Sequence, residues 1–294
     1  MNALLINLES DPQQAQAIAH AMQAELGELE QRHFPDGESY LRVLNDCNNR
    51  DVVIFCNLAR PNEKTLRLLF LIDTLRDLGA RQVGLITPYL AYMRQDKRFK
   101  PGECVSSRPY ARLLSQALDW LVTMDPHLHR YDSLDQIYSI PSQVVPAAPL
   151  IADWIRHNLE RPLLIGPDSE SEQWVSEVAR LADAPFQVLT KVRHGDYDVE
   201  VSLPDVDRWR DHTPVLVDDI ISSGRTMIET VNHLTHAELK RPCCIGVHGL
   251  FAGDAYSHLL EVADVVTTGC IPHESNKIDI SDALAEAAIQ QLKR

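Results

Sequence analysis

The sequence predicts two α/β domains in tandem, each built around a mainly parallel sheet. Short apolar runs alternate with segments of helical periodicity along all 294 residues. Runs such as residues 214–217 are apolar throughout, which is typical of parallel strands that helices cover on both faces. Three prolines between residues 139 and 149 interrupt a stretch of little periodicity, so we expect one domain at residues 1–145 and a second at 146–294.

The elements expected in each half follow the same pattern. In the first half we expect strands at residues 4–8, 52–58, 83–88 and 121–124, further strands around a turn at 34–38, and helices at 12–25, 63–78 and 107–118. In the second half we expect strands at 163–166, 186–191, 199–203, 215–217, 243–250 and 265–268, and helices at 151–159, 172–181, 227–236 and the C-terminus. Because no sequence repeat links the halves, only this order of elements indicates that they are alike.

Composition and charge narrow the class of protein. The net charge of -14 argues against nonspecific binding to nucleic acid and against docking on an anionic membrane. The N-terminus lacks the pattern of an export signal, and no apolar run is long enough to span a bilayer. The six cysteines form no Cys-x-x-Cys pair, so we expect neither a zinc ribbon nor a disulfide framework. A cytoplasmic enzyme is therefore expected.

Residues 215–226 carry the strongest functional signal. The apolar run ends on Asp218 and Asp219, and a hydroxyl-rich loop follows before a helix. Adjacent carboxylates can accept hydrogen bonds from vicinal sugar hydroxyls, while N–H groups and hydroxyls at a helix N-terminus bind phosphate. An ordinary turn with an N-capping aspartate is the alternative. Because two such carboxylates are costly without a ligand or cation, the pattern favours a ribose 5-phosphate site.

The first half contains three weaker motifs. The segment 34–38 is a Pro-Asp-Gly turn, for which a purely structural role is the simpler interpretation. The basic segment 88–99 follows an apolar strand and favours contact with phosphate over a merely solvated loop. At 125–129, an aspartate and two alternating histidines follow another strand, so a metal or phosphate contact and a structural role are both open.

The second half adds two more segments. Residues 167–172 end a strand, and Asp168 lies where a ligand is expected, although capping of the next helix explains the segment equally. Residues 191–196 lie between two strands and suggest a hairpin that carries Lys191 and Arg193. Surface cations are usually just solvated, but a hairpin with two of them can close over a charged transition state.

Taken in order, these segments resemble the ribose-phosphate pyrophosphokinase family, also called phosphoribosyl pyrophosphate synthetases. The resemblance covers nearly the whole chain and rests on the turn 34–38, Arg94-Gln95-Asp96, the strand end 125–127, Lys191-x-Arg193, the loop 218–226, Val247-His248-Gly249 and Ile271-Pro272. Residues 97–103 with Ser106 are similar to the shorter, archaeal-type branch. The resemblance implies two tandem phosphoribosyltransferase-like (Rossmann-like) domains, the first on the nucleotide side and the second on the ribose 5-phosphate side.

The resemblance also implies an activity. Such an enzyme is a transferase of nucleotide biosynthesis that moves the diphosphoryl group of Mg-ATP to the C1 hydroxyl of ribose 5-phosphate. Its products are 5-phosphoribosyl 1-diphosphate and AMP. Mg²⁺ would be the cofactor, and the protein would be a homo-oligomer that binds neither nucleic acid nor a membrane.

Site residues are implied position by position. ATP would bind Phe34, Asp36, Gly37, Glu38, Arg94 and Gln95, and magnesium would associate with His127 and Asp168. Ribose 5-phosphate would bind Arg193, Asp218, Asp219, Ser222, Ser223, Gly224, Arg225 and Thr226. Lys191 and Arg193 would be the catalytic cations.

Two other functions remain open at this point. A phosphoribosyltransferase would use the 218–226 loop in the same way, but it leaves the first domain unexplained. A catalytically silent regulatory subunit of the synthetase is suggested by the acidic segment 169–173, which stands where the family has paired glycines. Retention of Lys191, Arg193 and His127 argues against that second alternative.

Overall fold

The chain forms two compact units. This computed structural model describes residues 2–166, 171–193, 199–202 and 206–294. The first unit comprises Met1–Val145 and Ile280–Arg294, and the second comprises Pro146–Asp279. The boundary after Val145 lies at the expected position, whereas the last 15 residues, 280–294, belong to the first unit and not to the second as the sequence suggested. Among the described residues, no helix is both long and apolar enough to cross a bilayer.

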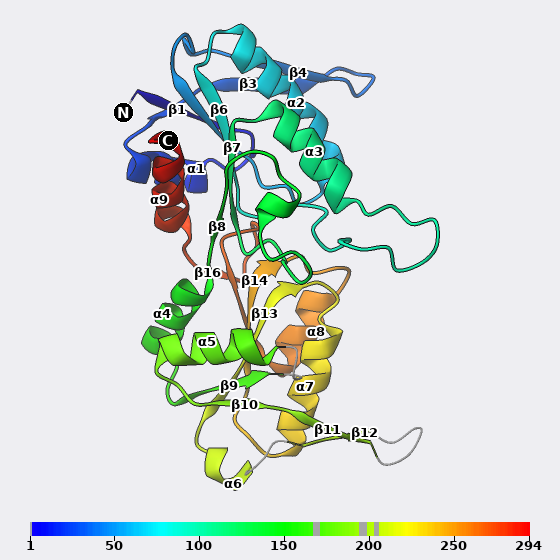
Figure 1. The fold of residues 1–294 in the computed structure, drawn as a ribbon. Helices are drawn as coiled ribbons and strands as arrows, with labels where there is room; N and C mark the ends of the chain where they lie inside the picture. The colour runs from blue at the N-terminus through cyan, green and yellow to red at the C-terminus, as the bar shows by residue number, and fades with distance from the viewer. Residues whose placement is uncertain (1, 167–170, 194–198, 203–205) are drawn as a thin grey trace. The chain divides into compact units, whose positions relative to one another are not determined.

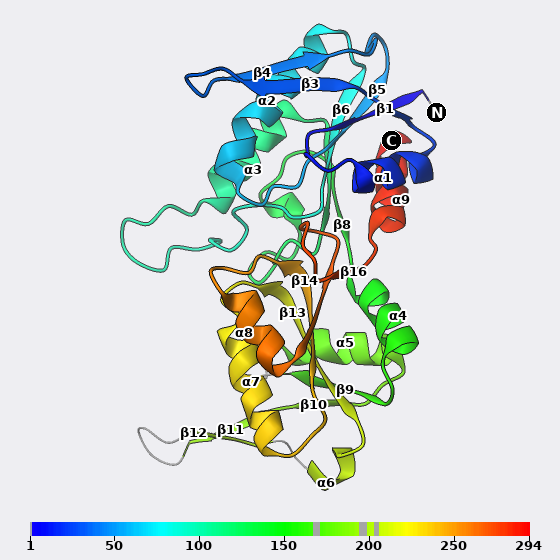
Figure 2. The same cartoon turned by 180° about the vertical axis from the view of Figure 1, so that it is seen from behind.

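The first unit is a six-stranded sheet with helices on both faces. The strand order is β2-β1-β5-β6-β7-β8, and every pairing is parallel. The strands are β1 (Ala3–Asn7), β2 (Glu25–Leu26), β5 (Asp51–Phe55), β6 (Gln82–Thr87), β7 (Trp120–Met124) and β8 (Ser142–Val145). Helices α1 (Gln13–Met22) and α9 (Ser281–Leu292) cover one face, while α2 (Pro61–Asp77) and α3 (Ser107–Ala117) cover the other (Figures 1 and 2).

The second unit has the same architecture. Its strand order is β10-β9-β13-β14-β15-β16, again with every pairing parallel. The strands are β9 (Pro162–Gly166), β10 (Phe186–Val188), β13 (Thr213–Ile221), β14 (Cys243–Gly249), β15 (Asp264–Thr268) and β16 (Asn276–Ile278). The helices are α4 (Ala148–Asn158), α5 (Glu172–Ala182), α6 (Val206–Trp209), α7 (Arg225–His236) and α8 (Ala255–Val262). Leu163, Leu216 and Leu259 contribute to its buried core.

Within the described part of the chain, each unit carries one antiparallel hairpin outside its sheet. In the first unit, β3 (Leu29–His33) pairs with β4 (Ser39–Val43), and in the second, β11 (Thr190–Arg193) pairs with β12 (Val199–Ser202). Both hairpins follow the first two strands of their sheet in chain order. The two sheets therefore share one topology, which includes the position of the inserted hairpin.

The C-terminal helix α9 packs on the first unit because its buried face is apolar and fits there. Leu284, Ala285 and Ala288 are fully or almost fully buried, and the helix contacts α1, β7 and β8. Gln143 of β8 bonds to Gln290 at 2.8 Å and accepts a hydrogen bond from Gln291 at 2.9 Å. Burial of small apolar side chains against a second helix allows the close approach that this face requires.

Two local expectations need correction. The strand expected at 215–217 is β13, which continues to Ile221 because Ile220 and Ile221 pair with His248 and Gly249 of β14. Asp218 and Asp219 therefore lie within the strand and not at its end. The short strands β2, β8 and β16, the 3₁₀ helix η1 (Leu134–Gln136) and the helices α6 and α8 were not expected. The strands, η1 and α6 are too short to show a periodicity.

Candidate functional site: two strand-edge clusters

The loop after β13 has the geometry of a phosphate-binding turn. Ser222, Ser223 and Gly224 connect the strand directly to α7, which begins at Arg225. Gly224 has a φ of +67°, and a Cβ there would lie 3.0 Å from the Cδ1 of Leu259. Only glycine meets both conditions without strain. The turn therefore presents the N-terminus of a 12-residue helix, where free N–H groups bind an anion.

The loop is held in place by the segment that follows β14. The N–H of Ala252 donates to the carbonyl of Ser222 at 3.0 Å, and the N–H groups of Leu250 and Phe251 donate to the carbonyl of Ile221 at 3.0 and 3.1 Å. The side chains of Ser223, Arg225 and Thr226 are exposed and that of Ser222 is half-buried. A fixed backbone with accessible hydroxyl and guanidinium groups suits a phosphate monoester.

Asp218 and Asp219 are half-buried carboxylates on adjacent residues of β13. The backbone N–H of Asp219 donates to the Oδ1 of Asp218 at 2.9 Å. Burial, together with the neighbouring Asp219 carboxylate, raises the pKa of Asp218 to about 7. Such a pair can accept hydrogen bonds from two vicinal hydroxyls, or balance the charge of a bound cation.

The predicted catalytic cations lie on the hairpin of the second unit. Lys191 and Arg193 occupy alternate positions of β11, in register with Val201 and Val199 of β12. The expectation of a hairpin around residues 191–196 is therefore confirmed for the two described strands. Asp168, the predicted magnesium residue, lies outside the described residues. Ser171 is the N-cap residue of helix α5 but makes no side-chain capping hydrogen bond, and Glu172 is the acidic residue of the first turn.

In the first unit, the turn 34–38 forms the tip of the β3–β4 hairpin. Phe34 and Glu38 close the turn through a backbone hydrogen bond of 2.8 Å, and Gly37 has a φ of +93°. Phe34 is 38% exposed. The guanidinium of Arg32 lies 4.6 Å from its centroid and 4.3 Å from that of Tyr40. An aromatic ring and two carboxylates are thus displayed at the end of an ordered hairpin.

The predicted nucleotide residues Arg94 and Gln95 lie in the loop after β6. Arg94 is exposed, while Gln95 is half-buried and accepts a hydrogen bond from the hydroxyl of Ser106 at 3.3 Å. The loop after β7 carries His127, whose backbone φ is +57°. Since β6 and β7 are adjacent parallel strands, both loops leave the same edge of the sheet, the edge at which α/β proteins bind ligands. His127 and the exposed His129 are close, with ring centroids 4.0 Å apart.

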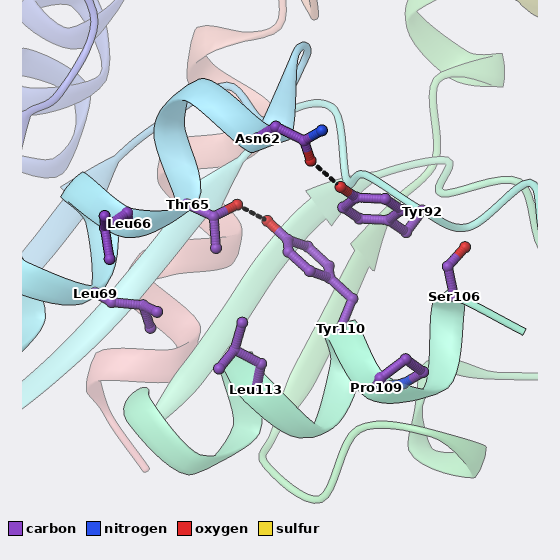
Figure 3. A pocket seen from close by; sticks show the side chains of 9 residues that line it. All are labelled: Asn62, Thr65, Leu66, Leu69, Tyr92, Ser106, Pro109, Tyr110 and Leu113. Atoms are coloured by element: carbon purple, nitrogen blue, oxygen red, sulfur yellow. Dashed lines mark hydrogen bonds between the residues drawn. The ribbon is translucent and has the colours of Figure 1, made fainter. Parts of the chain in front are cut away.

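A pocket of about 530 Å³, which the sequence did not predict, adjoins the loop after β6 (Figure 3). It is lined by Asn62, Thr65, Leu66, Leu69, Tyr92, Ser106, Pro109, Tyr110 and Leu113. Tyr92 bonds to Asn62, and Thr65 bonds to Tyr110 at 3.0 Å, as the dashed lines in Figure 3 show. Burial raises the pKa of Tyr110 above its ordinary value. The pairing of α2 with α3 builds this pocket, so no local sequence signal could have found it.

The fold and the strand-to-helix loop define a protein with two tandem phosphoribosyltransferase-type domains. Residues 3–117 match the family model of the N-terminal domain of ribose phosphate pyrophosphokinase, and residues 133–281 match that of the phosphoribosyl transferase domain. The structure is similar to the phosphoribosylpyrophosphate synthetase from Mycobacterium smegmatis, with a TM-score of 0.84, 25% identity, and coverage of 100% of this chain and 99% of that one. The predicted fold class is thereby confirmed.

The chain belongs to the ribose-phosphate pyrophosphokinase family. It is 32% identical over 274 residues to the ribose-phosphate pyrophosphokinase of Methanopyrus kandleri, and the aligned residues cover 92% of this chain and 93% of the relative. It is 31% identical over 288 residues to that of Methanothermobacter thermautotrophicus, with coverage of 96% and 99%. Both the resemblance stated from the sequence and the prediction of an enzyme are confirmed by this membership.

Proposed function

We propose that this protein transfers the β,γ-diphosphoryl group of Mg-ATP to ribose 5-phosphate. The C1 oxygen attacks the β-phosphorus, the bond from that phosphorus to the α-phosphate oxygen breaks, and the hydroxyl proton is released. The products are 5-phosphoribosyl 1-diphosphate and AMP. The observation that carries the proposal is that one chain matches both family domains, because a phosphoribosyltransferase has no need of the first one.

The second domain would bind the acceptor. The loop of Ser222, Ser223, Gly224, Arg225 and Thr226 would take the 5-phosphate, since it offers hydroxyls, a guanidinium and a helix N-terminus. Asp218 and Asp219 would accept hydrogen bonds from the ribose hydroxyls, and Arg193 would add a further contact. A fixed acceptor turns the encounter of two substrates into a reaction between aligned groups.

The first domain would bind the nucleotide. Arg94 and Gln95 lie in a loop at the ligand edge of the sheet, and an exposed guanidinium there is suited to the phosphates of ATP. Phe34, Asp36, Gly37 and Glu38 would contact adenine and ribose through the exposed ring and the carboxylates of the hairpin tip. In a homo-oligomer this tip could serve a neighbouring copy.

Magnesium would bind through few protein ligands. Mg²⁺ prefers oxygen ligands and keeps several waters, so on ATP it needs only one or two protein groups. His127 and Asp168 would associate with the ion. When bound, magnesium supplies positive charge to the phosphate oxygens. The half-buried Asp218 and Asp219 carboxylates are oxygen donors of the kind this ion favours.

Lys191 and Arg193 would supply charge during the reaction. Phosphoryl transfer relies on alignment of the two oxygens and on neutralisation of developing charge. Alternate positions on one strand let two cations act on the same group. The reaction would take place in the cytoplasm.

A steady-state assay of AMP formation tests this proposal. With ATP, magnesium and ribose 5-phosphate we expect AMP and 5-phosphoribosyl 1-diphosphate in equal amounts, and a chelator should abolish both. Omission of ribose 5-phosphate serves as the control. An absolute need for a nucleobase would identify a phosphoribosyltransferase instead, and an inactive chain that changes the rate of an active synthetase would identify a regulatory subunit.

A further inference from the structure

The dipeptide Gln95-Asp96 is held by contacts from two other segments of the first unit. At the start of α3, the hydroxyl of Ser106 donates to the side chain of Gln95 at 3.3 Å, and the N–H of Ser107 donates to the carbonyl of Gln95 at 3.4 Å. From the loop after β7, Tyr131 donates its hydroxyl proton to the carbonyl of Asp96 at 3.2 Å. The loop that carries Arg94 is therefore anchored immediately beyond that residue.

The strongest of these contacts joins Asp96 to Arg130. The carboxylate of Asp96 is 1% exposed, and the Nη1 of Arg130 lies 2.9 and 3.0 Å from its two oxygens. The guanidinium is 44% exposed, so the pair reaches from the interior to the surface. A buried carboxylate is costly unless it is paired, and a charge-assisted hydrogen bond that satisfies both oxygens also fixes its direction.

The hydroxyls of Ser107 and Tyr131 link the two anchoring segments. Tyr131 has one hydroxyl proton, which it donates to Asp96, so Ser107 must be the donor in the 3.2 Å contact between their oxygens. Ser107 is 1% exposed. This chain of hydrogen bonds connects the first turn of α3 to the loop after β7, with the backbone of residues 95 and 96 between them.

We infer that Arg130 is a positioning residue for the nucleotide: through Asp96 it fixes the loop that presents Arg94 and Gln95. The inference rests on the proposed function, in which that loop binds ATP. Arg130 also lies three residues after His127, in the same segment, so one short loop would set both the nucleotide contacts and a magnesium residue. Arg130 itself touches Asp96 and approaches Phe99, whose ring centroid is 5.7 Å from its guanidinium carbon.

Equilibrium binding of ATP with magnesium, measured by calorimetry, tests the inference without turnover. Arg130→Met removes the guanidinium and keeps the apolar part of the side chain, and Arg130→Lys keeps the positive charge but not the planar guanidinium. The double variant Asp96→Asn with Arg130→Met leaves no unpaired buried charge, so it keeps the test valid if Arg130→Met alone does not fold. Arg76→Met is the matched control, since Arg76 is 40% exposed and pairs with Asp119 at 3.2 Å in the same unit.

For a positioning role we expect Arg130→Met and the double variant to weaken ATP binding roughly tenfold or more, with Arg130→Lys between them and the wild type. The KM for ribose 5-phosphate and the ATP affinity of the control should stay within about twofold of the wild type. ATP affinity within that margin in both Arg130→Met and the double variant, with only the melting temperature lowered, overturns the inference. The proposed function is judged separately, by whether the wild type forms AMP.

Discussion

Gly84 and Trp120 are register partners on adjacent strands, and the indole ring of Trp120 lies against the backbone of Gly84. A Cβ built on Gly84 would be 2.0 Å from the Cε2 of that ring, and the indole N–H donates to Gln82 at 3.1 Å. The contact fixes β6 against β7 in the middle of the first sheet. The loops that carry Arg94 and His127 continue from these two strands to the ligand edge of the sheet.

Substitution of Gly84 by alanine should therefore destabilise the first unit. The new methyl group cannot fit beside the ring without movement of a side chain that is 2% exposed. We expect a loss of about 2–3 kcal/mol in the free energy of unfolding, measured by urea denaturation. A second change, Trp120→Phe, should recover part of that loss, because the new methyl group clashes with the indole ring of Trp120 and a phenyl ring is smaller. Equal stability of Gly84→Ala and the wild type would contradict this packing.

Lys191→Ala should lower turnover by at least about 100-fold, because a cation that stabilises developing charge acts mainly in the transition state. Since β11 and β12 form a separate two-stranded sheet, we expect little change in the melting temperature. The assay is steady-state AMP formation. Lys277→Ala, at an exposed position of β16, is the control and should behave as the wild type. Near-normal turnover of Lys191→Ala would remove Lys191 from the proposed mechanism.

Gly224→Ala should impair binding of ribose 5-phosphate. Alanine at a φ of +67° is strained, and its methyl group would press on Leu259 at 3.0 Å, so the loop must shift. We expect the KM for ribose 5-phosphate to rise roughly tenfold. Gly102→Ala is a suitable control, since its φ is +86° but no atom lies within 4 Å of the Cβ position. A similar KM in both variants would show that the position of the loop does not matter.

The raised pKa of Asp218 makes the stability of the second unit depend on pH. Folding favours the protonated carboxyl, so this contribution is complete below about pH 4 and is lost as the pH rises through about 7. Asp218→Asn cannot ionise, so we expect it to be about 2 kcal/mol more stable than the wild type at pH 8.

Thermal unfolding at pH 5 and pH 8 measures this difference. The wild type should lose more stability than Asp218→Asn between the two values. Glu229→Gln, an exposed position on α7, should keep the wild-type profile. Parallel profiles for the wild type and Asp218→Asn would contradict the assignment of the effect to Asp218.

Most elements of the fold were accessible from local patterns. The apolar runs of β5, β7 and β14 are buried at every position, and such runs mark central parallel strands. The contiguous motifs 34–38 and 218–226 were also visible, because a turn and a strand-to-helix loop depend on neighbouring residues. The short edge strands were not, since two to four residues cannot show a period.

Contacts between distant residues could not be read in this way. Arg130 is 34 residues from Asp96, and Gln143 is 147 residues from Gln290. Neither pair has a local signature, since each exists only after the sheet has brought their loops or elements together. The pocket between α2 and α3 has the same origin.

The amino-acid sequence by itself indicated the α/β class, the order of most strands and helices, a boundary near residue 145 and the motifs that identify the family. Tertiary structure decided that the two sheets share one topology with a hairpin at the same place, that the C-terminal helix belongs to the first unit, and that Asp96 meets Arg130. The physical reason is the separation along the chain of the residues that interact. Periodicity and turn chemistry act over a few residues, whereas packing and buried ion pairs depend on which surfaces the whole chain brings into contact.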